Sequence, residues 1–404
     1  MPNRRDLLLV SIGSAVSWFG NSLAVIALTL TLRTSGSFAI TGLFLAETVP
    51  LLLVTSVAGL IVDRMPNRRL MILAETGQGV AAVGIALCQP HLAPVFALIV
   101  LLSVGTAIVR PAASALIPVI TGEEGSTRGY AWMSTASSTG LLLGTAAGGV
   151  LVTAFGTRTA LLIDAATFLV QAAALLWVRT ERRPDGKAER GSAGREIKAG
   201  LRLLYGDRVL ITAIGGVAIS YFAVNLVMVA EVFFITVNLH GNGIIFGIVQ
   251  AMWMVGVLIG ARIGGRFRSV RGVALLLAVC ECGMGFALGW PAVVPLFVVL
   301  AGAYFVGGIC NGAQNVAQSG LVRLRSPQDM RGRVFAGVNG LISAANLMAS
   351  AVGGVVVAEL GARFTYAVTS VTAMVFGLVV LLLSLRLTTS NSTAVEEQRT
   401  ARTV

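Results

Sequence analysis

Charged residues are scarce in this chain, and their scarcity decides the class of protein. Only 12% of the 404 residues are Asp, Glu, Lys or Arg, whereas 56% are hydrophobic, and the mean hydropathy is +0.85. A soluble protein usually has about a quarter charged residues, so this chain lacks the side chains needed to cover a globule. A soluble multidomain enzyme, a disordered chain and a secreted disulfide scaffold are excluded. An integral membrane protein is predicted.

Cysteine and histidine are also scarce, with four and two residues. The cysteines lie in or beside apolar runs, where a thiol behaves as a small hydrophobe, so we expect no disulfides. His91 and His240 lie far apart in predicted loops, which leaves little to build a metal site. No G-x-x-x-x-G-K-S/T phosphate loop and no nucleophile–base pair are visible. We therefore expect no cofactor, no metal, no ATP-driven pump and no enzyme.

Long apolar runs make up most of the chain. They suit membrane-spanning helices, which need ~20 apolar residues each, and their continuity excludes the alternating pattern of a β-barrel. The expected spans are at about 7–32, 38–62, 70–89, 92–117, 130–155, 159–178, 209–237, 244–263, 272–290, 292–316, 333–358 and 362–386. The predicted fold class is therefore an all-α membrane protein with twelve transmembrane helices.

The basic residues, which give a net charge of +12, lie mainly between the apolar runs. If the N-terminus is cytoplasmic, all but four of the 30 Lys and Arg residues lie on the cytoplasmic side, the exceptions being Arg33, Arg110, Arg158 and Arg363. Such a bias is the rule for cytoplasmic loops, so both termini are predicted to be cytoplasmic. The same bias explains the positive charge without a nucleic-acid partner.

A polar, basic stretch divides the twelve runs six and six. The expected parts are an N-terminal six-helix bundle at 1–178, a cytoplasmic linker at 179–208, a C-terminal six-helix bundle at 209–387 and a disordered cytoplasmic tail at 388–404. Within the linker, Ile197, Leu201 and Leu204 are spaced as on one face of a helix. Two interpretations stay open: an amphipathic helix on the inner leaflet, or a plain solvated linker.

The two halves repeat one another at an offset of 205 residues. The residues that coincide are Arg128 with Arg333, Gly148 with Gly353, Gly149 with Gly354, Gly156 with Gly361 and Arg158 with Arg363. Arginine and paired-glycine matches at one offset, with the same topology around them, indicate duplicated halves. Two parallel six-helix repeats are the pattern of one large transporter class, so we expect two pseudo-symmetric bundles.

A loop motif follows the second run, where residues 59–69 read GLIVDRMPNRR. This resembles the signature G-x-x-x-D-R/K-x-G-R/K-R/K between the second and third helices of the major facilitator superfamily, although Pro66 replaces the expected glycine. The matching residues are Gly59, Asp63, Arg64 and Arg68. The resemblance implies a major facilitator fold in which this motif stabilises an inner gate.

Small residues recur in the fifth run, at Gly140, Gly144, Gly148 and Gly149. Glycines four apart let helices approach closely, so simple packing is one interpretation. The run also resembles the G-x-x-x-G-P-x-x-G-G signature of exporters in the same superfamily, with Thr145 in place of the proline. Three further stretches are similar to the branch that contains enterobactin exporters and macrolide efflux proteins. They are 111–118 (PAASALIP), 164–168 (DAATF) and 331–336 (RGRVFA).

Acidic residues inside the apolar runs are candidates for proton coupling. A charge in lipid is costly, so such residues usually face a cavity and serve function, and export coupled to protons needs a carboxyl that binds and releases one. The candidates are Glu47, Glu231, Glu281 and Asp164. Glu75 and Asp164 lie near the ends of their runs, where a purely structural role is the alternative.

Polar side chains also recur at helical spacing along several runs, which places them on one face of each helix. The superfamily resemblance implies that the first, fourth, seventh and tenth helices line a substrate cavity, and interhelical hydrogen bonding is the alternative role. The candidate cavity residues are Ser14, Ser17, Trp18, Asn21, Arg110, Tyr221, Asn225, Tyr304, Asn311, Asn315, Asn339 and Asn346. Arg110 either pairs with a carboxylate or attracts an anionic substrate.

The predicted function is secondary active transport, as proton-coupled efflux of a drug-like, antibiotic or siderophore compound by alternating access. The expected partners are a small-molecule substrate, protons and the lipid bilayer of the bacterial cytoplasmic membrane, and the protein is expected to be a monomer. Two alternatives stay open: a uniporter or importer of the same fold, and a non-transporting membrane sensor.

Overall fold

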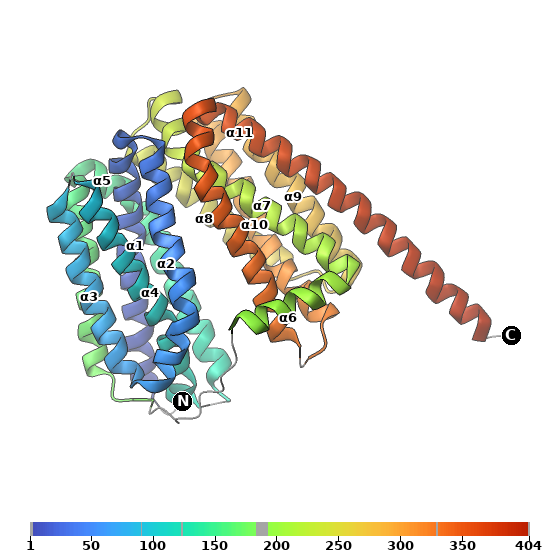
Figure 1. Cartoon of the computed structure of the whole chain (residues 1–404), viewed down its shortest axis with the longest axis horizontal. Coiled ribbons are helices and arrows are strands. Elements are labelled where there is room, and N and C mark those ends of the chain that lie inside the picture. The colour runs from blue at the N-terminus through green and yellow to red at the C-terminus, as the bar shows by residue number, and fades with distance from the viewer. Residues whose placement is uncertain (1–2, 90, 123, 183–192, 329, 403–404) are drawn as a thin grey trace. The chain divides into compact units, whose positions relative to one another are not determined.

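A computed structural model describes residues 3–89, 91–122, 124–182, 193–328 and 330–402, and leaves the side chains undescribed at 56–57, 59–60, 193–199 and 384–402. Almost all of these residues are helical, and no strand occurs among them (Figure 1). Two residues singled out in the sequence, Gly59 and Ile197, belong to helices but have no described side-chain environment.

The chain divides into two compact units. Unit 1 comprises Met1–Arg190 and His240–Ala251, and unit 2 comprises Gly191–Leu239 and Met252–Val404. The helices of unit 1 are α1 (Arg4–Leu32), α2 (Ser37–Arg64), α3 (Asn67–Cys88), α4 (Leu92–Thr121), α5 (Ser126–Trp177) and the start of α8 (Gly243–Gly264). The helices of unit 2 are α6 (Ala193–Gly206), α7 (Arg208–Phe233) with its π-helical extension Phe234–Asn238, the rest of α8, α9 (Val270–Val293), α10 (Phe297–Arg325) and α11 (Arg331–Arg402).

Two long helices each contain a sharp break at a glycine. Among the described residues, ten helices are long and apolar enough to cross a membrane, and two of these spans, in α5 and α11, have 52 and 53 residues. α5 breaks at Gly156 (φ 80°, ψ 165°), and α11 breaks at Gly361 (φ 76°, ψ 161°), where its ribbon reverses direction (Figure 1). Counting both halves of each gives twelve spanning segments, so the predicted fold class is confirmed.

The spanning helices are apolar on their inner and outer sides alike. On α3, for example, Met71 is fully buried, whereas Leu73 two residues later is 69% exposed. Helices that are hydrophobic all round belong to large cores or to membranes, and the outward side chains here have no protein to cover them. The outer face therefore suits contact with lipid chains.

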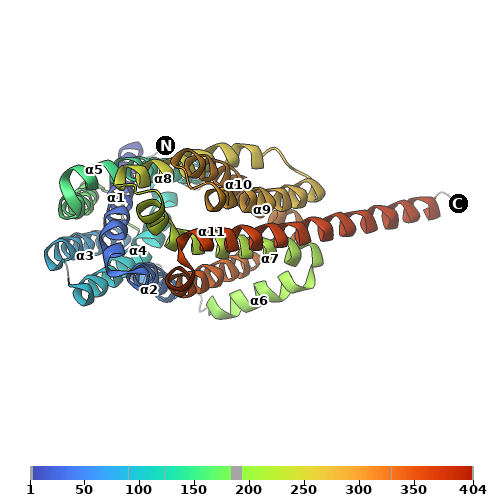
Figure 2. The same ribbon diagram turned by 90° about the horizontal axis from the view of Figure 1, so that it is seen from above.

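The linker contains the amphipathic helix α6, which runs beside the first half of α11 in both views of the ribbon (Figures 1 and 2). Leu204 is fully buried in the core of unit 2, and Leu201 packs against the same cluster. The two helices touch at their backbones, because a Cβ added at Gly200 would collide with the carbonyl oxygen of Arg333. The apolar side of α6 is thus covered by protein in this region.

The backbone of α11 is helical as far as Arg402, whereas the sequence predicts a disordered tail from Thr388. No glycine or proline follows Gly377, so the two residue types that disfavour a helix most strongly are absent from this stretch. Side chains beyond Leu383 lie outside the described part of α11.

Candidate functional site

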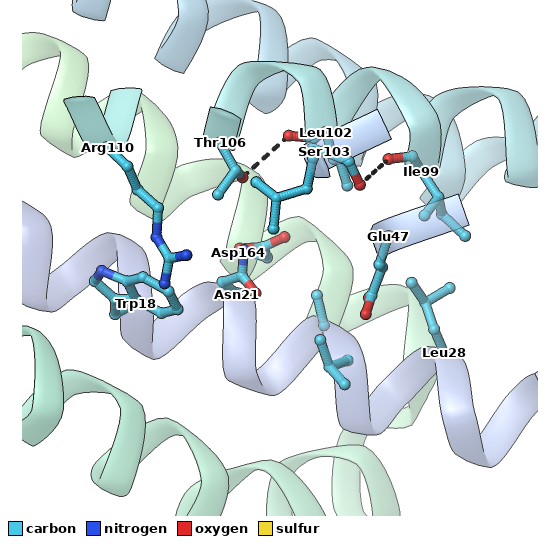
Figure 3. A pocket seen from close by; sticks show the side chains of 13 residues that line it. Trp18, Asn21, Leu28, Glu47, Ile99, Leu102, Ser103, Thr106, Arg110 and Asp164 are labelled. Atoms are coloured by element: carbon cyan, nitrogen blue, oxygen red, sulfur yellow. Dashed lines mark hydrogen bonds between the residues drawn. The ribbon is translucent and has the colours of Figure 1, made fainter. Parts of the chain in front are cut away.

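A cavity of about 180 Å³ lies inside unit 1, among α1, α2, α4 and α5. Its polar lining residues are Asn21, Glu47, Ser103, Thr106, Arg110 and Asp164, and Trp18 supplies an aromatic wall. Figure 3 shows Glu47 on one side of the cavity and Asp164 and Asn21 near its centre. Residues from four helices that are far apart in sequence therefore meet within the membrane-spanning part of one unit.

Arg110 stacks on Trp18 instead of pairing with an acid. Its guanidinium carbon lies 4.9 Å from the centroid of the indole ring (Figure 3), a distance suited to cation–π attraction. None of the ion pairs found among the described residues involves Arg110. The guanidinium is thus held in place by the ring while its hydrogen-bond donors remain available to a ligand.

A second cavity, of about 60 Å³, lies beside the first and shares Trp18, Asn21, Thr106 and Arg110 with it. Its further polar residues are Ser14, Ser17, Glu75, Gln78 and Gln171. Arg110 and Trp18 consequently border both spaces. Gln78 and Gln171 were not recognised in the sequence, although an amide within an apolar run is a signal that would have found them.

Three carboxyl groups share this region with the single guanidinium. Glu75 and Asp164 are each only 1% exposed, and they lie close enough to interact electrostatically across α3 and α5. Among the described groups, Glu75 Oε2 and Asp164 Oδ1 have no hydrogen-bond partner. The structure thus brings Glu47, Asp164 and Arg110 together as neighbours of one cavity, and adds Glu75 to them.

Some polar residues of α4 hold helices together rather than facing a ligand. The Ser103 hydroxyl lies 3.1 Å from the carbonyl oxygen of Ala46 on α2 and 3.0 Å from that of Ile99 on its own helix. Gln78 Nε2 donates to the carbonyl of Leu102 and to Thr106 Oγ1, which joins α3 to α4. Interhelical bonding therefore accounts for part of this polar stripe.

Unit 2 contains its own buried carboxyl, Glu231, within an aromatic cluster. Glu231 is 1% exposed and is hydrogen-bonded to Tyr304, whose hydroxyl lies 2.9 Å from that of Tyr366. Tyr366 packs on the ring of Phe234 and Tyr304 on that of Trp253. The cluster joins α7, α10 and α11 through one carboxyl and two phenols.

The other candidate residues of unit 2 mostly bind one another. Tyr221 on α7 donates to Asn315 Oδ1 at 2.5 Å, and Asn315 donates in turn to Asn311 Oδ1 at 3.2 Å. Asn225 donates to Asn346 Oδ1 of α11 at 2.7 Å. Asn339 is exposed on the first half of α11 and belongs to neither group.

Glu281 lies apart from these clusters. It is 1% exposed on α9, and neither of its carboxyl oxygens has a hydrogen-bond partner among the described groups. A Cβ at Gly216 would lie 2.6 Å from each of these oxygens, and Gly377 of α11 packs on the adjacent backbone. Glycines on two neighbouring helices therefore leave just enough room for this carboxyl.

The loop motif forms its contacts with the end of α5. Asp63 lies 3.3 Å from Arg182, beyond the end of α5, rather than pairing with Arg64 or Arg68. Arg68 instead donates to the carbonyl oxygens of Leu175 and Leu176 at 2.9 and 2.7 Å. In this arrangement the motif ties the end of α2 and the start of α3 to the end of α5.

The glycines of α5 allow very close helix contacts. A Cβ at Gly140 or Gly144 would collide with backbone carbonyl oxygens of α1, and one at Gly148 would meet Ile26 at 2.7 Å. Gly149 lies against the backbone of α8 at Gly243. The packing interpretation of this run therefore holds for all four glycines, and their role in export remains a prediction.

Comparison with known proteins agrees with this architecture. The family model described as Major Facilitator Superfamily matches residues 10–289 and 214–403, and so nearly the whole chain. The chain belongs to this superfamily. It is a multi-pass membrane transporter of the major facilitator fold, and transporters of this superfamily act on small molecules.

Individual relatives are distant. The chain is 23% identical to an uncharacterized MFS-type transporter, YfiS, of Bacillus subtilis (strain 168), over 94% of this chain and 93% of the relative. It is 24% identical to the enterobactin exporter EntS of Citrobacter koseri, over 82% and 78% of the two chains. These relatives confirm the resemblance to the superfamily that the sequence motifs suggested.

Solved structures share the fold at still lower identity. The nucleoside transporter NupG is 12% identical with a TM-score of 0.76, and the match covers 94% of this chain and 99% of that one. A bacterial homologue of the lysosomal transporter Spinster, solved in an inward-facing and unoccupied conformation, is 16% identical with a TM-score of 0.66, and the match covers 94% of each chain.

Proposed function

We propose that this major facilitator exports an amphipathic organic compound in exchange for protons, by alternating access. The observation that carries the proposal is the group of three carboxyls and one guanidinium around the cavities of unit 1. If all four were ionised, the region would have a net charge of −2 within the membrane. Buried charge is costly there, and binding of a proton by one or more of these carboxyls lowers the cost.

The cargo proposed is a drug-like, antibiotic or siderophore compound with an aromatic part and an anionic or hydrogen-bond-accepting part. Trp18 supplies a flat aromatic surface, and Arg110 supplies donors that no carboxylate occupies among the described residues. A relative named as an enterobactin exporter supports a siderophore-like cargo. The protein is further proposed to be a monomer of the bacterial cytoplasmic membrane with both termini inside.

The carboxyls proposed to carry protons are Glu47 and Asp164 in unit 1, and Glu231 and Glu281 in unit 2. The test is transport in proteoliposomes under an imposed pH gradient, with a panel of dyes, antibiotics and siderophores. The variants are Glu47→Gln, Asp164→Asn, Glu231→Gln and Glu281→Gln, and Glu359→Gln, which changes an exposed acid of α11, is the matched control. We expect gradient-dependent accumulation that the control keeps and at least one of the four variants loses.

Two other outcomes would overturn the exchange mechanism. Movement of a compound that is indifferent to the pH gradient and to all four variants would favour a facilitator of the same fold, or coupling to a different ion. Binding of a labelled compound without movement would favour a membrane sensor.

A further inference from the structure

A groove of about 400 Å³ runs along the outer surface of unit 1, between α1 and the second half of α5. Its walls are formed by Leu8, Ile12 and Val170, which are 38%, 59% and 53% exposed, and small side chains form its floor. The floor exists because Gly13 lies beside Ala174, so that neither helix fills the space. The lining is apolar along its length and becomes charged only at one end, at Arg4 and Arg5.

The length of the groove matches one leaflet of a membrane. Its lining on α1 extends from Arg4 to Val16, which at 1.5 Å per residue is about 18 Å. Half of a typical hydrocarbon core is about 15 Å. A phospholipid whose phosphate lies at the arginines therefore has an acyl chain of the right reach to lie along the groove.

The two arginines are held at the end of the groove by the fold. Asp6, between them and the apolar part of α1, is 1% exposed, and its Oδ2 accepts hydrogen bonds from the backbone N–H groups of Arg179 and Thr180 at 3.1 and 2.9 Å. These bonds fix the first turn of α1 to the segment that follows α5. Arg4 and Arg5 themselves are exposed and take part in none of the ion pairs found in the described part of the chain.

We propose that this groove binds one anionic phospholipid of the leaflet on the side of the N-terminus, with its phosphate at Arg4 and Arg5 and an acyl chain along α1. Charge complementarity favours this occupant over a second copy of the chain. A symmetric contact between two such grooves would place Arg4 and Arg5 of one copy beside Arg4 and Arg5 of the other. Like charges that lie close together repel one another. This lipid site is independent of the cargo and of the direction of transport.

The test is native mass spectrometry of the purified full-length protein in detergent, mixed with equal amounts of phosphatidylglycerol and phosphatidylcholine. We expect the parent to prefer phosphatidylglycerol by about tenfold, since each basic side chain near a membrane surface adds to the attraction of an anionic lipid. The double variant Arg4→Gln/Arg5→Gln should lose this preference. Ala174→Leu, which fills the groove, should weaken the binding of both lipids.

Two matched controls keep the test specific. Arg266→Gln/Arg268→Gln removes two exposed arginines of unit 2, and Ala173→Leu adds the same bulk at an exposed neighbouring position. Both should bind lipid as the parent does. Three results would overturn the proposal: an equal loss of preference in the unit 2 variant, displacement by soluble glycerol phosphate, and a dimer that Ala174→Leu dissociates. Normal lipid binding by Ala174→Leu with an unchanged melting temperature would overturn it as well.

Discussion

Among single residues, Arg110 offers a test of whether the polar residues of the unit 1 cavity serve stability or transport. The guanidinium stacks on Trp18 and has no carboxylate partner among the described residues, so its charge stabilises the fold less than an ion pair would. We expect Arg110→Gln to leave the melting temperature of the purified protein unchanged or raise it. Loss of a charged hydrogen bond to the cargo is worth about 1.5–3 kcal/mol, so transport should fall tenfold or more.

The matched control for this change is Arg323→Gln, because Arg323 is exposed near the end of α10. It should alter neither the melting temperature nor transport. If Arg110→Gln instead lowers the melting temperature by several degrees, then Arg110 serves the fold, and the functional interpretation of the cavity is wrong.

The residues of the unit 1 cavity show which features of the site the sequence predicts and which it does not. Helical spacing and the cost of charge in lipid were enough to select Glu47, Arg110 and Asp164, which the structure places around one cavity. The partner of Asp63 was not predictable in this way, because Arg182 lies 119 residues further along the chain. Periodicity describes one helix at a time, whereas a pairing between distant segments depends on how the helices are arranged.

Among the helices, the breaks in α5 and α11 test whether the backbone at Gly156 and Gly361 can be adopted only by glycine. Their φ and ψ values lie in a region that is essentially open to glycine alone, and a residue forced into it costs about 1–3 kcal/mol. A Cβ at either position would meet no other atom within 4 Å, so only the backbone is at issue. We therefore expect Gly156→Ala and Gly361→Ala each to lower the free energy of unfolding by this amount, measured in detergent.

Gly77→Ala on α3 and Gly215→Ala on α7 are the matched controls. Both glycines lie inside helices and also have open space where a Cβ would go. Alanine is favoured over glycine in a helix by about 0.5–1 kcal/mol, so these two changes should be neutral or stabilising. An equal change in the free energy of unfolding at all four positions would contradict this prediction. It would show that alanine adopts the backbone conformation at Gly156 and Gly361 without added cost.

Asp207 joins the start of α7 to the end of α10. Its carboxylate accepts from Arg325 at 2.8 and 2.9 Å and from the N–H groups of Val209 and Leu210. Partial burial disfavours the ionised form, but the Arg325 guanidinium and the two N–H groups outweigh it and hold the pKa of Asp207 below its usual value. The carboxylate therefore stabilises the fold fully above the ordinary Asp value of about 3.9, and this contribution is lost as the pH falls through the lower, folded-state pKa.

The variant Asp207→Asn isolates the ion pair, because asparagine caps a helix about as well as aspartate. We expect it to be less stable than the parent at pH 7, and the difference in melting temperature should shrink as the pH falls below about 4. Asp207→Ala should lose a further ~1 kcal/mol with the cap. A difference between parent and Asp207→Asn that does not change with pH would contradict the assignment.

At the scale of the whole molecule, the distribution of basic residues predicts which ends of the helices face the cytoplasm. The single-cysteine variants Thr34→Cys and Arg268→Cys place thiols at exposed positions on the two predicted sides, in a background with the four native cysteines replaced. A membrane-impermeant maleimide should label Thr34→Cys in intact cells, and should label Arg268→Cys only after the cells are opened. The reverse pattern would invert the predicted topology.

The overall plan was the most predictable part of the protein. Twelve apolar runs and a repeat at an offset of 205 residues were enough for the fold class, and the breaks at Gly156 and Gly361 lie at matching positions of that repeat. The burial of α6 was not predictable, because the spacing of its leucines predicts an apolar helix face but does not show whether lipid or protein covers that face. Only the position of α11 beside it decides between the two.

The breaks at Gly156 and Gly361 also have a consequence for biosynthesis. Each leaves only a short turn between two spanning segments, so the second segment begins almost as soon as the first one ends. The two segments of α5, and those of α11, are therefore expected to leave the translocon as preformed pairs. Each pair would then enter the membrane in one step, so that the number of insertion steps is smaller than the number of spanning segments.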